Sequence, residues 1–285
     1  MKIFDCTTFY SEHLMMDVRF NVLNEHVHKF IVAESTFSHS GEPKKLNFDI
    51  NNYPKFKDKI IYVIIDKEPN NIIGIEDKLL TAVDKRSNSL KRIELSYDYM
   101  IKSLDMALDN DLIILSDNDE IPNLGSKQFK SSNKDIFIFK QLFFYYKFNL
   151  FYDLVPWYGS KAAKKKKLLS MSWLRNLKNK QYPFWRLDTL FSNNKYINLD
   201  IVNDGGWHFT NLKTAEELYQ KPATIFESIQ KFLGLPKFHP ANYAHYNLGK
   251  RHEISTTTRN FLREFFKPYN EELYKFLGRD FGWER

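Results

Sequence analysis

Three acidic residues follow a short apolar run near the middle of the chain. Positions 112 to 115 are all apolar, and Asp117, Asp119 and Glu120 come shortly after them. An apolar run of this length predicts a strand buried on both faces, as in a parallel sheet. Carboxylates crowded at the end of such a strand repel one another and lose hydration, which a bound cation relieves. The segment therefore predicts a Mg²⁺ or Mn²⁺ site that holds an anionic ligand such as a phosphate.

The competing interpretation of this segment is an ordinary polar turn. Asp and Asn are favoured turn residues, and Pro122 is compatible with a turn. Two Asp residues with one residue between them often occur by chance. The same pattern after an apolar run and before Glu-Ile-Pro is much less common, and ligands bind at the carboxyl ends of strands in open α/β sheets. The metal site is therefore favoured.

Length, cysteine usage and hydropathy set the broad class. The chain has 285 residues, enough for one large domain or two small ones. Its single cysteine, Cys6, excludes an internal disulfide and fits a reducing compartment. The sequence shows no signal peptide and no apolar stretch near the ~20 residues that span a bilayer. We expect a cytoplasmic protein, or one that is peripheral at the inner face of a membrane.

A basic run accounts for much of the net charge of +7. Lys161 and the four lysines 164–167 fall within seven positions. Such a run binds nucleic acid, anionic lipids or a phosphorylated substrate, or is simply a solvated surface. No nucleic-acid recognition motif accompanies the lysines, so we expect no nucleic-acid partner. A peripheral membrane contact through Lys161–Lys167 is the partner prediction for this run.

Strands and helices alternate along the first half of the chain. Apolar runs predict strands, and apolar residues at helical spacing predict helices. The expected order is strand 3–6, helix 12–23, strand 30–34, strand 60–65, helix 90–108 and strand 112–115. This order predicts a mostly parallel central sheet flanked by helices.

The second half is expected to add strands and then helices. Strands are predicted within 135–148 and at 197–202, and short helices from Leu212 onward. Helix signals there are a capping box at Thr214–Glu217, Pro222, Gly234 and a stop at Gly278. We expect one domain, 1–285, with a nucleotide-binding half (1–122), an acceptor-side half (123–211) and a helical C-terminal subregion (212–285).

Five segments together resemble a known family. They are Phe30–Ser38, Gly41–Lys44, Ser116–Pro122, Trp157–Lys161 and Gly205–Thr210. In this order they resemble glycosyltransferase family 17, which includes the bisecting N-acetylglucosaminyltransferase of N-glycan processing. The resemblance extends from about Ile3 to Thr210. Its most specific parts are Ser-Asp-x-Asp-Glu-Ile-Pro and Gly-Trp-His-Phe.

The resemblance implies a GT-A type, Rossmann-like fold and an inverting transfer from a nucleotide sugar. In the best-known members the donor is UDP-N-acetylglucosamine, and a divalent metal is required. Asn118 stands where the family usually has Val, which leaves both acids in place. The N-terminal membrane anchor of well-known eukaryotic members is missing here. We therefore expect a glycan or lipid-linked glycan acceptor on the cytosolic side instead of a Golgi glycoprotein.

Metal-binding roles can be assigned to the acids and to one histidine. Asp119 is the first choice as a direct metal ligand, and Asp117 would bind the metal or the nucleotide ribose. Glu120 would support catalysis by orienting these groups, or it is a plain turn acid. His208 would bind the metal or the diphosphate, or it is a core histidine, and Trp207 would stack on a sugar or simply pack.

Other residues are candidates for nucleotide binding. Arg92 offers a planar fork suited to phosphate, against a helical salt bridge as the competing interpretation. Glu34 ends a strand and would accept from uracil or ribose, against a role as a turn acid. Lys161 would reach a phosphate, although its neighbours suggest a solvated basic face.

An inverting transferase also needs a general base near the acceptor hydroxyl. Asp204 is the first candidate and Asp188 the reserve, and spacing does not choose between them. Two other functions compete with the transferase. One is a phosphatase of the HAD type, which also places two Asp residues after a strand, and the other is a non-catalytic basic protein that binds acidic polymers or membranes.

Overall fold

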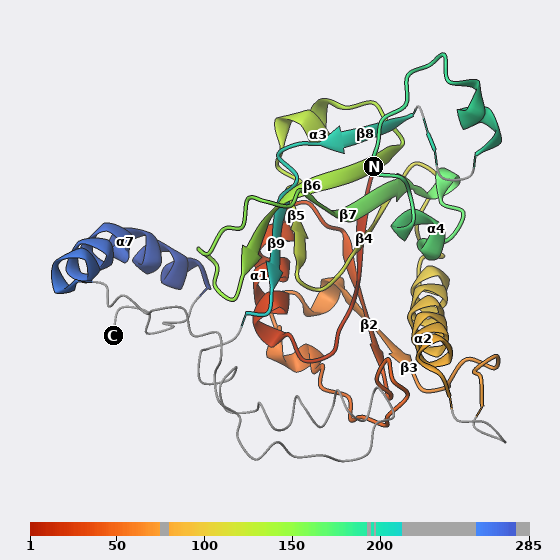
Figure 1. Ribbon diagram of the computed structural model, residues 1–285, viewed down its shortest axis with the longest axis horizontal. Coiled ribbons are helices and arrows are strands. Elements are labelled where there is room, and N and C mark those ends of the chain that lie inside the picture. Colours follow the sequence, from red (N-terminus) through yellow and green to blue (C-terminus); the bar gives the residue numbers. More distant parts are fainter. Residues whose placement is uncertain (75–79, 193–194, 197, 213–254, 278–285) are drawn as a thin grey trace. The chain divides into compact units, whose positions relative to one another are not determined.

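The computed structural model describes most of the chain in two compact units. The described residues are 1–74, 80–192, 195–196, 198–212 and 255–277. The units are Met1–Gln220 and Lys221–Arg285. Figure 1 labels the elements of both units. The predicted subdivision at residues 122 and 211 stays a prediction.

Four parallel strands form one half of the sheet in the first unit. They are β1 (Ile3–Thr8), β2 (Lys29–Ser35), β3 (Ile60–Ile65) and β4 (Leu112–Ser116). Their spatial order is β3-β2-β1-β4, and every pairing among them is parallel. The four predicted strands of the first half are confirmed. All five residues of β4 are buried, as its apolar run predicts.

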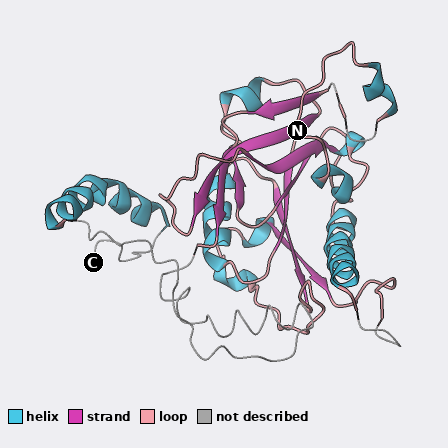
Figure 2. Ribbon diagram, in the orientation of Figure 1, coloured by secondary structure: helices cyan, strands magenta, loops and turns pink. Residues whose placement is uncertain are grey.

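The other strands continue the sheet in mixed directions (Figure 2). They are β5 (Glu120–Pro122), β6 (Ile136–Tyr145), β7 (Trp157–Lys164), β8 (Leu199–Val202) and β9 (Gly206–Thr210). The strands β6 and β8 confirm the two later strand predictions, whereas β5, β7 and β9 were not expected. Within the described part, five strand pairings are parallel and three are antiparallel. The chain is thus an α/β protein with a mostly parallel sheet.

Helices α1 (His13–Leu23) and α2 (Ala82–Lys102) lie on opposite faces of the parallel half (Figure 1). The ring of Phe20 on α1 packs edge-on against Phe30 of β2, while Ile31 and Ala33 of β2 face the core under α2. The shorter helices are α3 (Lys127–Ser131), α4 (Met171–Arg175), η1 (Ile50–Asn52), η2 (Lys57–Lys59), η3 (Lys165–Lys167) and η4 (Leu187–Phe191).

Helix α2 begins and ends earlier than the predicted 90–108. Its start is set by a capping box, in which the Thr81 hydroxyl accepts from Asp84 N (3.2 Å) and Asp84 accepts from Thr81 N (2.9 Å). After the helix ends at Lys102, Leu104 is still buried, whereas Leu108 is exposed. The apolar spacing therefore continues past the end of the helix itself.

The second unit contains helix α7 (Thr256–Leu277), which includes Pro268. A helix in the last thirty residues is thereby confirmed. The predicted capping box at Thr214 and the signals at Pro222, Gly234 and Gly278 lie outside the described residues. Of the helices that the structure describes, none is both long and apolar enough to cross a membrane.

The strand order creates a switch point between β1 and β4. The chain moves outward from β1 to β2 and β3, and then returns to place β4 on the other side of β1. In open α/β sheets such a switch point, outside the carboxyl ends of the strands, is where ligands bind. Thr7 of β1 and Ser116 of β4 are paired at this edge, so the residues that follow Ser116 lie at the switch point.

Candidate active site

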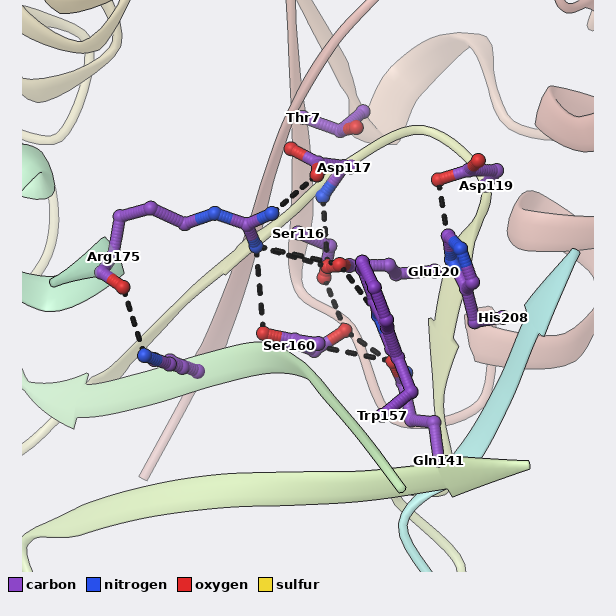
Figure 3. Close-up of polar contacts among 12 residues, drawn as sticks. Thr7, Ser116, Asp117, Asp119, Glu120, Gln141, Trp157, Ser160, Arg175 and His208 are labelled. Carbon is purple, nitrogen blue, oxygen red and sulfur yellow. Dashed lines mark hydrogen bonds and ion pairs between the residues drawn. The ribbon is translucent and has the colours of Figure 1, made fainter. Parts of the chain in front are cut away.

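The acid loop, defined here as residues 117–120, follows β4 at the switch point (Figure 3). Glu120 N donates to Asp117 O (3.1 Å), which closes the loop as a tight turn before β5. Figure 3 shows Arg175 on the side of Asp117 and His208 on the side of Asp119. The sequence-based prediction that these acids gather at the carboxyl end of a buried strand is confirmed.

Arg175, at the end of α4, forms ion pairs with two of the acids. Its Nη2 donates to Asp117 Oδ2, and its Nη1 lies 3.3 Å from both carboxylate oxygens of Glu120. The guanidinium is about a quarter exposed. Two of the three carboxylates thus share this arginine and Asp119 does not contact it, which leaves the loop with an excess of negative charge.

Glu120 is the fully buried residue of the acid loop. Its side chain is fully buried, and it accepts from Asp117 N (3.0 Å) and from Trp157 Nε1 (3.0 Å) besides Arg175. A carboxylate held by three donors orients its neighbours and is not open to an acceptor sugar. This geometry supports the orienting role predicted for Glu120 and argues against its being a turn acid.

Asp117 is the residue of the acid loop whose charged form is disfavoured. Its pKa is raised to about 6, because the crowded site desolvates the carboxylate and Glu120 repels it, with a smaller contribution from Asp119. Arg175 lowers the pKa without cancelling the rise. Nearly half of the side chain is exposed, so a ligand can reach it. A second cation nearby would stabilise the charged form of this carboxylate.

Asp119 and His208 face each other across β5 and β9. His208 is paired with Glu120 in the ladder, and its Nδ1 lies 3.4 Å from Asp119 Oδ1. This Nδ1 is buried and makes no hydrogen bond among the described residues. The imidazole stacks on Trp157 (centroids 4.2 Å apart) and on Phe143 (4.8 Å), and these two rings also stack on each other (5.4 Å). The aromatic rings hold the ring rigidly while its nitrogen is left for another partner.

These residues fit a divalent cation that a ligand helps to hold. Among the described residues, no three His, Cys, Asp or Glu side chains come close enough to form a complete metal site. Asp119 and the orphaned Nδ1 of His208 nevertheless offer two donors, with Asp117 nearby. Mg²⁺ and Mn²⁺ sites commonly use one or two carboxylates and take the remaining ligands from phosphate oxygens and water.

A buried ion pair between Arg19 and Asp5 holds the backbone of the acid loop in place. Arg19 of α1 is fully buried and donates to both carboxylate oxygens of Asp5 (2.6 and 2.5 Å). Its Nη1 also donates to Glu120 O (2.8 Å) and lies 3.4 Å from Asp117 O. Arg19 thereby ties the loop backbone to β1 and α1. Because Asp5 neutralises it, Arg19 adds little charge to the site.

The glycines near His208 serve strand packing. A Cβ at Gly205 would lie 2.4 Å from Lys140 O, and one at Gly206 would lie 2.1 Å from Ile121 O. Gly206 also has a φ of 103°, which favours glycine. The absence of a side chain at these two glycines therefore lets the neighbouring strands β6 and β5 pack closely.

Trp207 and Trp157 differ in their relation to the acids. Side chains alternate along a strand, so Trp207 points to the face of β9 opposite His208. Trp157 instead stacks on His208 and donates to Glu120. Sequence reasoning quoted the Trp157 segment as a family motif but gave this residue no role. The aromatic side chain beside the acids is therefore Trp157.

Glu34 and Arg92 hold the loop that follows β2. Glu34 is buried and accepts from Lys44 Nζ, Asn47 N (2.8 Å), Phe48 N (3.0 Å) and Tyr62 OH (2.7 Å). Burial alone would raise the pKa of this carboxyl, but these hydrogen bonds outweigh it and lower the pKa. Arg92 donates to Glu68 (2.8 Å) and to His39 O (3.1 Å). Both side chains are engaged structurally, which argues against the nucleotide contacts predicted for them.

The lysine run is mostly engaged within the protein. Lys161 is buried, and its Nζ donates to Arg175 O and Leu177 O (both 2.8 Å). Burial, with Arg175 nearby, lowers its pKa to about 8. Three neighbours have partners as well, namely Lys164 with Asp135, Lys165 with Leu104 O and Ala107 O, and Lys166 with Asn110. A solvated face is wrong for Lys161, and the membrane contact stays a prediction.

The two candidate general bases lie away from the acid loop. Asp204 accepts from Asn123 Nδ2 (2.9 Å) beyond the carboxyl end of β5, whereas the acid loop lies at its amino end. Asp188 accepts from Arg186 (2.7 Å) and Lys195 (2.9 Å), and both cations lower its pKa. A carboxylate with a lowered pKa is a weak base. Neither position supports the predicted role.

The fold and site define a class of protein, an α/β protein whose acid loop lies at the switch point of its sheet, where open α/β sheets bind their ligands. The sequence model of glycosyltransferase family 17 matches residues 1–171, more than half of the chain. The chain therefore belongs to glycosyltransferase family 17 and is a glycosyltransferase. The family membership decides against the two competing functions, the phosphatase and the non-catalytic binding protein. A search of curated proteins found no match.

Proposed function

We propose that the protein is a metal-dependent, inverting glycosyltransferase that transfers a sugar from a UDP-sugar to a hydroxyl of a glycan acceptor. N-acetylglucosamine is the proposed sugar, by resemblance to the best-known members of the family. The observation that carries the proposal is the acid loop, whose three carboxylates exceed the charge of Arg175 at the ligand-binding edge of the sheet.

In this proposal the chain's own residues prepare the place of the departing diphosphate. Asp119 and His208 Nδ1 would hold the cation, with Asp117 on its other side. A bound Mn²⁺ or Mg²⁺ would act as a Lewis acid that stabilises the leaving group. Glu120 and Arg19 fix the loop from the buried side, so the ligand oxygens stay preorganised and lose little entropy on binding.

A GT-A type fold is part of the proposal, and the strand order supports it. The order β3-β2-β1-β4 with parallel pairings is that of a doubly wound nucleotide-binding half. The acid loop leaves the last of these strands and leads into the mixed strands that carry Trp157 and His208. The mixed half would then receive the acceptor, again as a proposal.

Ligand-dependent thermal unfolding tests the donor and the metal together. The purified chain is heated with UDP-, GDP- and CMP-sugars, each with and without Mn²⁺. We expect stabilisation by UDP-sugars that depends on Mn²⁺ and is lost in Asp119→Asn. An equal response to all nucleotides, or a response that persists without metal, would contradict the proposal.

The stereochemical part of the proposal has its own test. NMR of the product formed from an α-linked UDP-sugar should show a β-linkage to the acceptor. Retention of the α-configuration would contradict inversion while leaving the metal and donor assignments standing.

A further inference from the structure

Arg175 lies outside the residues matched by the family model, yet it forms ion pairs with two members of the acid loop. We propose that Arg175 is an internal counter-ion, which holds Asp117 while no divalent cation is bound and donates to the donor diphosphate once the cation takes Asp117. This inference rests on the proposed function. It assigns Arg175 two successive partners and predicts opposite effects on metal and nucleotide binding.

The two ends of the guanidinium face different surroundings (Figure 3). On one side Nη1 lies 3.3 Å from the fully buried Glu120 and 3.4 Å from Gly159 O, at the long end of the hydrogen-bond range. On the other side Nη2 binds Asp117, whose side chain is nearly half exposed. The exposed contact with Asp117 is the one that a ligand at the switch point can replace.

Charge balance gives the reason for the exchange. The nearby cations Arg19 and Lys161 are already engaged, Arg19 by Asp5 and Lys161 by two backbone carbonyls. Arg175 therefore supplies the positive charge that the acid loop meets in the metal-free protein. A divalent cation brings twice that charge to the same carboxylate oxygens and weakens the hold of the guanidinium on Asp117. The released planar fork matches the oxygens of a diphosphate.

The backbone of Arg175 is held in place, while its side chain is about a quarter exposed. Lys161 Nζ donates to Arg175 O (2.8 Å), and the Ser170 hydroxyl caps the start of α4 by accepting from Trp173 N (2.9 Å). Rotamer changes of a partly exposed side chain occur in nanoseconds, so the exchange needs no movement of α4. The proposed step is a side-chain rotation on a rigid support.

The experiment compares two equilibria in the full chain. Mn²⁺ binding is measured without nucleotide, by the electron paramagnetic resonance signal of free Mn²⁺. UDP binding is measured by calorimetry at saturating Mn²⁺. The variants are Arg175→Gln, Arg175→Lys and, as a matched control, Arg186→Gln, which removes an arginine that pairs with Asp188 on the surface.

We expect Arg175→Gln to bind Mn²⁺ about 3- to 10-fold more tightly and UDP at least ~10-fold more weakly, since each tenfold step is about 1.4 kcal/mol. Arg175→Lys keeps a positive charge that competes with Mn²⁺ for Asp117, but it lacks the planar guanidinium that donates two parallel hydrogen bonds. Its Mn²⁺ affinity should stay within about twofold of wild type, and its UDP affinity should fall about 3- to 10-fold. Arg186→Gln should change neither affinity beyond about twofold.

Each outcome decides the matter. If Arg175→Gln weakens both affinities, or changes neither, Arg175 is only structural and the inference is wrong. If that variant does not fold, Arg175→Lys decides, because equal losses of Mn²⁺ and UDP would overturn the inference. If wild type itself binds neither ligand, the proposed function fails as well, which separates that failure from a failure of Arg175 alone.

Discussion

Glu34 on β2 and the acid loop after β4 belong to neighbouring regions of the same parallel sheet, but their acids are satisfied to different degrees. Glu34 is fully buried and accepts four hydrogen bonds, from one lysine, one tyrosine and two backbone amides. In the acid loop Asp117 and Glu120 share Arg175, and Asp119 faces a histidine nitrogen that has no hydrogen bond among the described residues.

The difference shows how a structural acid can be told from a ligand-binding acid. Both kinds occur at the carboxyl end of a buried strand, so position does not separate them. The number of donors does, because a buried carboxylate with a full set of donors has nothing left to offer a cation. By this measure Glu34 anchors a loop, whereas the acid loop still needs positive charge.

The largest effect is expected from Asp119→Ala. Loss of a direct metal ligand should reduce turnover by about 10³-fold, on the order of 4 kcal/mol of transition-state stabilisation. The melting temperature of the metal-free protein should hardly change, because in the described part of the chain the Asp119 carboxylate meets only the His208 imidazole, 3.4 Å away. Steady-state kinetics and thermal unfolding measure the two quantities, and full activity in this variant would end the metal assignment.

Glu34→Ala should show the opposite pattern. Removal of this carboxylate leaves four donors without their partner, two of them backbone amides, and should lower the free energy of unfolding by about 3 kcal/mol. Mn²⁺ affinity should be unchanged in the folded variant. Urea unfolding and a Mn²⁺ titration check this, and a loss of Mn²⁺ affinity without a loss of stability would break the comparison.

His208→Ala should weaken Mn²⁺ binding by about 10- to 100-fold, because it removes the orphaned Nδ1. His208→Phe is the matched control, since it keeps an aromatic ring that stacks on Trp157 and Phe143 but has no nitrogen. Both variants should lose metal affinity, and the alanine variant should lose more stability. Retained affinity in both would make His208 a core histidine.

The smallest effect concerns pH. A carboxylate whose pKa is raised to about 6 in the folded state costs stability when it ionises above that pH. Metal-free Asp117→Asn should therefore be slightly more stable than wild type at pH 7.5, and the difference should shrink as the pH falls from 6 towards 4. Paired thermal unfolding curves measure the difference. A constant difference in stability over this pH range would show that the pKa of Asp117 is not raised in the folded protein.

The sequence predicted those features that local patterns encode. Long apolar runs marked β1 to β4, and the spacing of acids after β4 marked the acid loop. The short strands β5 and β9 were missed because three to five residues carry too weak a period. Strand β7 was missed because its sequence leads into the lysine run, which was interpreted as a basic surface.

The partners of the acids were harder to predict because they are distant in sequence. Arg175 lies 55 residues from Glu120, and no local spacing connects the two. Arg19 did leave a signal, since it lies four residues after Met15 and four before Leu23, on the buried face of α1. An arginine on an apolar helix face predicts a buried carboxylate partner. The roles of Glu34 and Arg92 depend on a loop whose path no motif encodes.

The stack of Trp157 on His208 has a practical consequence. Indole fluorescence responds to the ring beside it and to the partner of its N–H, and Trp157 contacts both His208 and Glu120. A cation bound at the imidazole would change the emission of this side chain without any added dye. The fluorescence of Trp157 therefore reports on cation binding beside the acids, and replacing Trp157 by phenylalanine would remove this signal.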